Sequence, residues 1–143
     1  MRNAQRIALV GVAAASLALL PGTADATPAS GVTGRIIIQK TINGKDYILR
    51  KITVAPGGTT GWHYHDGTLY ALVKKGTLTH TDSDCTTADT YGAGSTFIEP
   101  SGAGHVHIGR NIGSAPVVLE VFYVDPAGSP LAEDAPNPGC SFQ

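Results

Sequence analysis

Histidine spacing is the feature of this sequence that most clearly indicates chemistry. All five histidines fall within the 45 residues from His63 to His107, and they include two His-x-His pairs, His63/His65 and His105/His107. On a β-strand this spacing places both imidazoles of a pair on one face, where their nitrogens can reach a single metal ion at about 2.0–2.1 Å. The pattern therefore predicts a metal site, with histidines hydrogen-bonded on an ordinary sheet face as the alternative.

A β fold is needed to bring the two pairs together. Pairs on different strands can share an ion only where the strands meet across an interior, so we expect an all-β antiparallel sandwich or small barrel. Alternation then places Trp62 and Tyr64 on the face opposite His63 and His65, in packing or in a subunit contact. Eight short segments between turn residues are predicted as strands: Arg35–Gln39, Tyr47–Val54, Gly61–His65, Leu69–Lys74, Thr77–Asp82, Ser95–Glu99, His105–Arg110 and Pro116–Asp125.

Composition and charge narrow the class of protein. The chain has 143 residues, of which 42% are hydrophobic and 15% charged, and its formal net charge is -1. This length corresponds to one domain, and the chain is too apolar and too weakly charged to be disordered. Because it has no excess of basic residues, we do not expect it to bind nucleic acid.

The first 26 residues have the organisation of a cleavable signal peptide. Arg2 and Arg6 form a basic start, an uncharged run of 14 residues extends from Ile7 to Leu20, and Ala24-Asp25-Ala26 offers small residues for cleavage. The run is too short for a membrane-spanning helix, which needs about 20 residues. We therefore expect a secreted protein, extracellular or in the cell envelope, with no membrane association after removal of residues 1–26.

The two cysteines, Cys85 and Cys140, are predicted to pair in an oxidising compartment, with two unpaired thiols as the alternative. The bridge closes a loop of about 55 residues, which corresponds to about 4 kcal/mol of chain entropy. We expect a barrel over residues 27–125. The Pro/Gly-rich tail, residues 126–143, is expected to lie irregularly on the surface, tethered by Cys140.

Two segments resemble the conserved motifs of the cupin superfamily. The first reads Gly57-x5-His63-x-His65-x3-Leu69-x6-Gly76 and is similar to the cupin pattern G-x5-H-x-H-x3,4-E-x6-G in every position except the glutamate. The second is similar to G-x5-P-x-G-x2-H-x3-N. Its counterparts here are Gly94, Pro100, Gly102, a histidine at either His105 or His107, and Asn111. We favour His107, because the count back from Asn111 selects it.

The resemblance implies a jelly-roll-like β-barrel that holds a divalent metal through His63, His65 and His107. It also implies a departure, because Leu69 stands at the glutamate position, or Tyr70 if the longer spacing applies. Three neutral ligands leave the charge of the ion uncompensated. Further candidates for the metal site or its pocket are His105, His80, Tyr70 and Glu99. For Glu99 we expect a solvated acid at a strand end, with an inward base or substitute ligand as the alternative.

The function implied by this resemblance is that of a secreted cupin with a three-histidine metal site. The ion would be Fe, Mn or Zn, and the protein would be a small-molecule oxygenase or another metal-dependent enzyme. The alternative is a non-catalytic barrel that binds a small molecule or a metal, and a third reading is a structural barrel without metal. The same resemblance implies a homodimer.

Overall fold

The structure is a computed structural model and describes residues 26–143. This part of the chain contains ten strands, all paired antiparallel. The predicted signal peptide therefore lies outside the described residues except for Ala26. No helix among the described residues is long and apolar enough to cross a membrane. The strands are β1 (Ser30–Ile42), β2 (Lys45–Thr59), β3 (His63–Tyr64), β4 (Thr68–Lys75), β5 (Thr77–Asp82), β6 (Ala88–Gly92), β7 (Thr96–Glu99), β8 (His107–Arg110), β9 (Val117–Pro126) and β10 (Glu133–Asp134).

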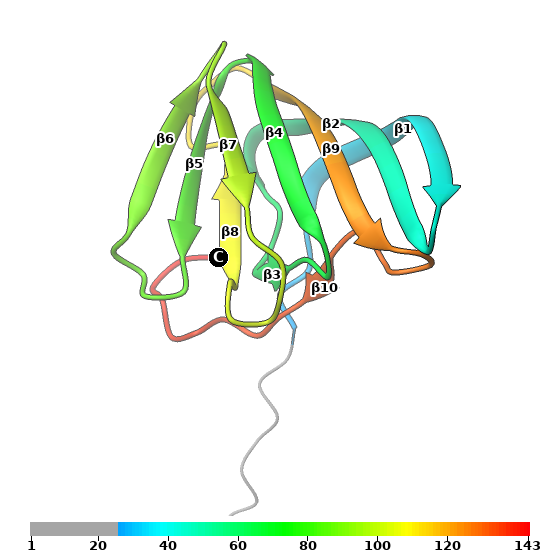
Figure 1. Cartoon of the computed structure of the whole chain (residues 1–143). Helices are drawn as coiled ribbons and strands as arrows, with labels where there is room; N and C mark the ends of the chain where they lie inside the picture. The colour runs from blue at the N-terminus through cyan, green and yellow to red at the C-terminus, as the bar shows by residue number, and fades with distance from the viewer. Residues whose placement is uncertain (1–25) are drawn as a thin grey trace, which may run out of the picture.

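The strands make two faces of a nearly closed barrel (Figure 1). One face has the order β1-β2-β9-β4-β7, and the other has the order β6-β5-β8-β3-β10. The faces are joined where Thr59 of β2 pairs with Arg110 of β8. This arrangement agrees with the predicted all-β antiparallel barrel.

Alternating apolar residues create the interior. In β9 the residues Val117, Leu119, Val121 and Tyr123 are buried, and the residues between them are more exposed. Because successive side chains of a strand point to opposite faces, this pattern turns one side of each strand inward. The main core contains the buried apolar residues of five strands and their neighbours: Ile48, Val54, Leu69, Ala71, Val73, Leu78, Phe97, Val117, Leu119, Val121 and Tyr123.

The C-terminal tail differs from the predicted irregular surface segment. Its strand β10 pairs with β3, and Ala135 and Cys140 are buried in a second apolar cluster around Trp62. The ring of Phe142 stacks on Trp62 with centroids 6.0 Å apart. Trp62 thus faces away from the barrel interior, as alternation predicts, and its partner is the tail of the same chain.

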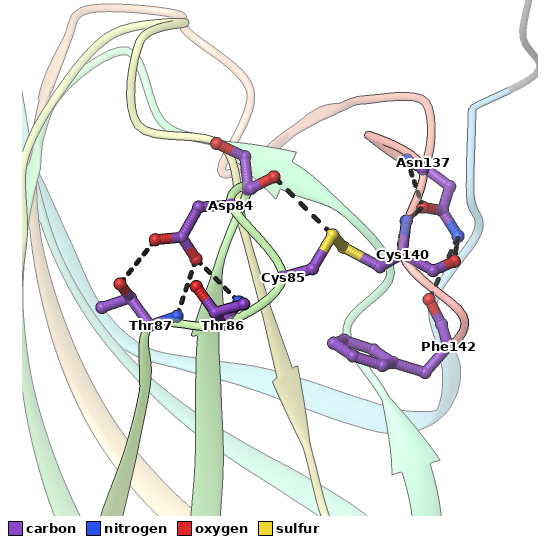
Figure 2. Close-up of a disulfide and its surroundings, with 9 residues drawn as sticks. Asp84, Cys85, Thr86, Thr87, Asn137, Cys140 and Phe142 are labelled. Carbon is purple, nitrogen blue, oxygen red and sulfur yellow. Dashed lines mark hydrogen bonds between the residues drawn. A yellow bond between two sulfur atoms is a disulfide. The ribbon is translucent and has the colours of Figure 1, made fainter.

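A disulfide between Cys85 and Cys140 fixes the end of this tail to the loop between β5 and β6, as predicted (Figure 2). On the tail side, the Asn137 side chain accepts hydrogen bonds from the backbone N–H groups of Gly139 and Cys140 and donates to the carbonyls of Cys140 and Phe142. These contacts order the turn that carries Cys140.

Two further differences concern strands. β6 is not among the predicted strands, because its sequence Ala88–Gly92 is largely polar. It is mostly exposed, as expected for an edge strand that pairs only with β5. β1 is longer than predicted, and its residues Ile36, Ile37, Ile38 and Ile42 are 43–63% exposed. An exposed apolar edge is a surface that proteins usually cover. The homodimer stays a prediction.

Candidate metal centre

Three histidines converge because β3 and β8 are neighbours. His63 of β3 lies directly opposite His107 of β8 in the antiparallel register, and His65 follows one residue after β3. The ring centroid of His63 lies 4.8 Å from that of His65 and 4.4 Å from that of His107. The sequence-based expectation that the two strands meet across an interior is therefore wrong: they are hydrogen-bonded neighbours in one sheet, and cross-strand pairing places the rings together.

Each of the three rings is oriented through its Nδ1 atom. The Nδ1 atoms of His63, His65 and His107 lie 2.9, 2.8 and 2.7 Å from the backbone carbonyls of Gly61, Leu131 and His105. A carbonyl can only accept a hydrogen bond, so each Nδ1 carries the proton. The lone pair of a neutral ring is then on Nε2, which is the atom left to bind a metal.

Gly61 is required for this arrangement of His63. Its φ is +70°, and a Cβ atom at this position would lie 2.1 Å from the carbonyl oxygen of Thr27. Only glycine tolerates both conditions. The Thr27 hydroxyl in turn accepts a hydrogen bond from the Trp62 backbone N–H at 2.6 Å. The segment that carries His63 is thus held against the start of the barrel.

Glu99, at the end of β7, completes the cluster. Its carboxylate oxygens lie 3.1 Å from Nε2 of His65 and 3.4 Å from Nε2 of His107, and its side chain is only 12% exposed. The expectation of a solvated acid at a strand end is therefore wrong. Glu99 pairs with Leu69 of β4 in the sheet register. The chain thus places a carboxylate on the strand beside the one where the cupin pattern has its glutamate.

The remaining candidate residues separate into two groups. His80 of β5 joins the cluster, with its Nε2 3.4 Å from Glu99, and a second set of potential ligand atoms comprises His80, Glu99 and His107. Tyr70 is 48% exposed and lies on the outer face, because its neighbour Leu69 points inward. His105 is exposed and precedes β8, which begins at His107, but it lines the cavity that reaches His80, Glu99 and His107, as its prediction as a pocket residue allows. Its backbone carbonyl, however, orients the His107 ring.

The histidine nitrogens and the Glu99 carboxylate form a cluster that can hold a cation. Nε2 of His65, His80 and His107 is buried and has no well-aligned hydrogen-bond partner. A neutral ring whose Nδ1 is protonated presents an Nε2 lone pair to the carboxylate, so two acceptors face each other. Ligands at about 2.1 Å from one ion are about 3.0–3.4 Å apart for octahedral or tetrahedral angles. The observed spacing of 3.1–3.4 Å matches that geometry.

The ionisation of the cluster follows from its burial and its contacts. Burial, together with the charges of His107 and His65, lowers the pKa of His63 to about 3. Burial opposes ionisation of Glu99, but contacts with His107, His65 and His80 hold the pKa of this carboxyl well below its usual range. Burial also opposes protonation of His107, but its contact with Glu99 raises the pKa of the ring. Without metal, one proton shared with Glu99 thus takes the place of a cation.

We expect the metal-free protein to lose stability as the pH falls from 6.5 toward 3. Because the pKa of His63 is about 3 in the folded protein and 6.5 when unperturbed, the unfolded chain binds a proton that the folded chain does not. This proton lowers the free energy of unfolding by about 1.4 kcal/mol per pH unit in that window. Glu99 acts in the same direction below its unfolded pKa. His107 has the opposite effect. Its raised pKa stabilises the folded protein at low pH, and this contribution is lost as the pH rises through the pKa that His107 has in the folded protein.

Urea unfolding of metal-free protein between pH 6.5 and 4 measures this slope. A His63→Asn variant removes the titrating ring, so its stability should depend on pH less steeply by one proton. An identical slope in the two proteins contradicts the assignment of the low pKa to His63.

Two cavities meet at the cluster. A small cavity of about 50 Å³ lies inside the barrel and is lined by His63, His65, Leu69 and Glu99 among others. A larger one of about 390 Å³ has His80, Glu99 and His107 in its lining and extends to the loop between β5 and β6. Glu99 and Phe97 line both, so these two side chains lie where the cavities adjoin. A molecule that enters the larger cavity can reach the cluster.

The comparison with protein families agrees with this geometry. The Cupin_2 model, described as a cupin domain, matches residues 50–124. The chain belongs to the cupin family. The matched segment of this cupin includes His63, His65, Glu99 and His107. No curated protein matches the chain.

Solved structures show the same fold at low sequence identity. The polyketide cyclase RemF from Streptomyces resistomycificus is 20% identical, with a TM-score of 0.60 over 78% of this cupin and 79% of that chain. Rru_A2000 from Rhodospirillum rubrum, a cupin-2 domain, is 15% identical, with a TM-score of 0.60 over 74% and 66%. Oxalate oxidase in complex with the substrate analogue glycolate is 23% identical, with a TM-score of 0.56. This cupin aligns over 66% of its length with about half, 51%, of that chain.

Proposed function

We propose that this cupin is an exported metalloprotein that binds one divalent ion through Nε2 of His63, His65 and His107. Glu99 supplies a fourth, anionic ligand in place of the glutamate that the first cupin motif lacks here. The observation that carries the proposal is the convergence of three Nδ1-oriented rings, two of which, His65 and His107, have Nε2 at 3.1 and 3.4 Å from the buried Glu99 carboxylate. His80, which contacts the same carboxylate, borders the open side of the cluster.

Three imidazoles and one carboxylate suit iron, manganese or zinc. When bound, such an ion supplies a Lewis acid, and iron or manganese also supplies redox chemistry. The residues of the chain would orient the ligands, exclude water from the inner side of the cluster and admit a small molecule through the larger cavity. We therefore favour a metal-dependent enzyme that acts on a small molecule, either an oxygenase or an enzyme of another class. Two structural neighbours, the polyketide cyclase RemF and oxalate oxidase, are named as enzymes, which supports this choice.

The alternative is a barrel that binds a metal or a small molecule without turnover. One observation favours it: among the described residues, Glu99 is the carboxylate nearest to the rings, and it is itself needed as a ligand. The two functions differ in whether a bound small molecule is converted. Export is supported by the Cys85–Cys140 disulfide, since disulfides persist in oxidising compartments.

Elemental analysis of the purified protein, with its disulfide intact, tests the proposal. We expect about one equivalent of Fe, Mn or Zn per chain, and loss of at least nine tenths of it in the His63→Ala/His107→Ala double variant. His105→Ala is the matched control, because this histidine is exposed and contributes only its backbone carbonyl. The element found would separate redox chemistry from Lewis-acid chemistry. If neither protein holds metal after incubation with all three ions, the metalloprotein proposal is wrong.

A further inference from the structure

The larger cavity has a composition that selects for charge. Its inner end is formed by His80, Glu99 and His107, and its outer part by the end of β5, the loop that follows, and β6. The volume of about 390 Å³ lies at the lower end of the range for small-molecule sites. His107 is 97% buried, and its Nε2 has no well-aligned hydrogen-bond partner. Because this nitrogen is a proposed metal ligand, the inner end of the cavity is where a bound molecule would meet the ion.

The side chains around this cavity carry a strong negative charge. Asp82, Asp84, Asp89 and Glu99 line it, and among the described residues no Lys or Arg does. Asp84 stays ionised, because hydrogen bonds from Thr87 and Thr86 lower its pKa to about 2. A divalent ion would offset only two of the four negative charges. His80, His105 and His107 also line the cavity. An excess of one sign of charge raises the local concentration of ligands of opposite sign.

The aromatic residues of the cavity suit the same kind of ligand. The rings of Tyr91 and Phe97 stack with centroids 4.3 Å apart, and His80 lies 5.8 Å from Phe97. The Tyr91 hydroxyl donates to the Asp89 carboxylate at 3.2 Å. Aromatic rings beside carboxylates attract ammonium groups through cation–π and charge interactions together. Apolar contact with the rings also accommodates the methyl groups of a substituted amine.

We propose that the ligand of this site is a small organic cation, whose ammonium group lies among Asp82, Asp84 and Asp89 while its other end reaches the metal. The position of the metal end rests on the proposed function, whereas the charge preference rests on the cavity alone. A small carboxylate, such as the glycolate in the oxalate oxidase complex, would meet like charges along the whole entry route here.

Choline and 3,3-dimethylbutanol test this inference, because they have the same shape and differ only by the replacement of nitrogen with carbon. Calorimetry or NMR titration of the metal-loaded protein should show choline binding about tenfold more tightly than the alcohol. Glycolate should bind more weakly than choline. The preference should decrease with added salt, because the outer acids are exposed to solvent.

An Asp82→Asn/Asp89→Asn variant should lose the preference for choline and keep its metal content. Asp84 is left in place, since its carboxylate orders the turn at Thr86 and Thr87. Asp66→Asn is the matched control, because Asp66 is an exposed acid outside the cavity. Equal affinities for choline and its isostere, tighter binding of glycolate, or no binding of choline overturns the inference, even if metal is bound. If the protein binds none of the three metal ions and still prefers choline, the inference is supported and the proposed function is wrong.

Discussion

A Glu99→Leu variant should bind divalent metal at least about 100-fold more weakly than the wild-type chain. A Leu69→Glu substitution added to this variant should restore binding. The first effect is expected because the variant loses its only anionic ligand and keeps three neutral ones. The second follows from the sheet register, in which Leu69 of β4 lies directly opposite Glu99 of β7. Both side chains line the small cavity beside His63 and His65. A glutamate at either position therefore reaches the same point.

Competition with a chromophoric chelator measures the affinities, and thermal unfolding checks that each variant is folded. The matched control is Leu69→Gln with Glu99→Leu, which has the same size as the restoring variant but no charge. If this control binds metal as tightly as the variant with glutamate, the carboxylate does not act as a ligand. If Glu99→Leu alone binds as tightly as the wild type, three histidines suffice and the role assigned to Glu99 is wrong.

The location of Glu99 shows what the sequence could and could not predict. Local spacing was enough to pick out both His-x-His pairs, because each occupies positions whose side chains can share a face, but the choice of His107 over His105 came from the count back from Asn111 in the cupin pattern. The place of Glu99 beside the histidines depends on the pairing of β4 with β7. This pairing joins residues 30 positions apart, so it leaves no trace in local spacing. One signal was available. Phe97 is a core residue in the same strand, and alternation places Glu99 on the same face.

The contribution of the tail was less predictable still. Its contact with the cluster uses the backbone carbonyl of Leu131, and a backbone atom has no side-chain signature in a sequence. The prolines of residues 126–143 correctly indicated little regular structure, but they did not show that β10 would pair with β3. The cysteines did predict the covalent link of the tail to the β5–β6 loop, because two cysteines in a chain that we expect to be exported allow one bridge.

The tail is the basis of the second large effect. Three of its contacts lie beside the cluster: the Leu131 carbonyl accepts the Nδ1 proton of His65, Asp134 pairs with His63 in the strand register, and the Ala135 N–H donates to the Trp62 carbonyl at 2.8 Å. Cys140 lies farther along the same segment and is the covalent attachment of its end (Figure 2). The disulfide therefore holds in place the groups that orient two of the ligands.

A Cys85→Ser/Cys140→Ser variant should lose both stability and metal affinity. Loss of a crosslink that spans 55 residues lowers the free energy of unfolding by about 4 kcal/mol in the chain-entropy model. Release of the tail also leaves His65 without its hydrogen-bond acceptor, and loss of such an orienting contact typically weakens metal binding by about 10–100-fold. Urea unfolding and chelator competition measure the two effects separately.

Ile48→Ala separates loss of ligand orientation from general destabilisation. Ile48 is 3% exposed in the main core, apart from the cluster beneath the tail, and truncation of a buried isoleucine costs about 2–5 kcal/mol. This variant should be destabilised to a similar extent while a folded molecule keeps its metal affinity. If both variants lose affinity equally, the disulfide acts only on global stability. A selective loss in the cysteine variant means that the tail orients the ligands, and reduction of the disulfide would then release the metal from a chain that is still folded.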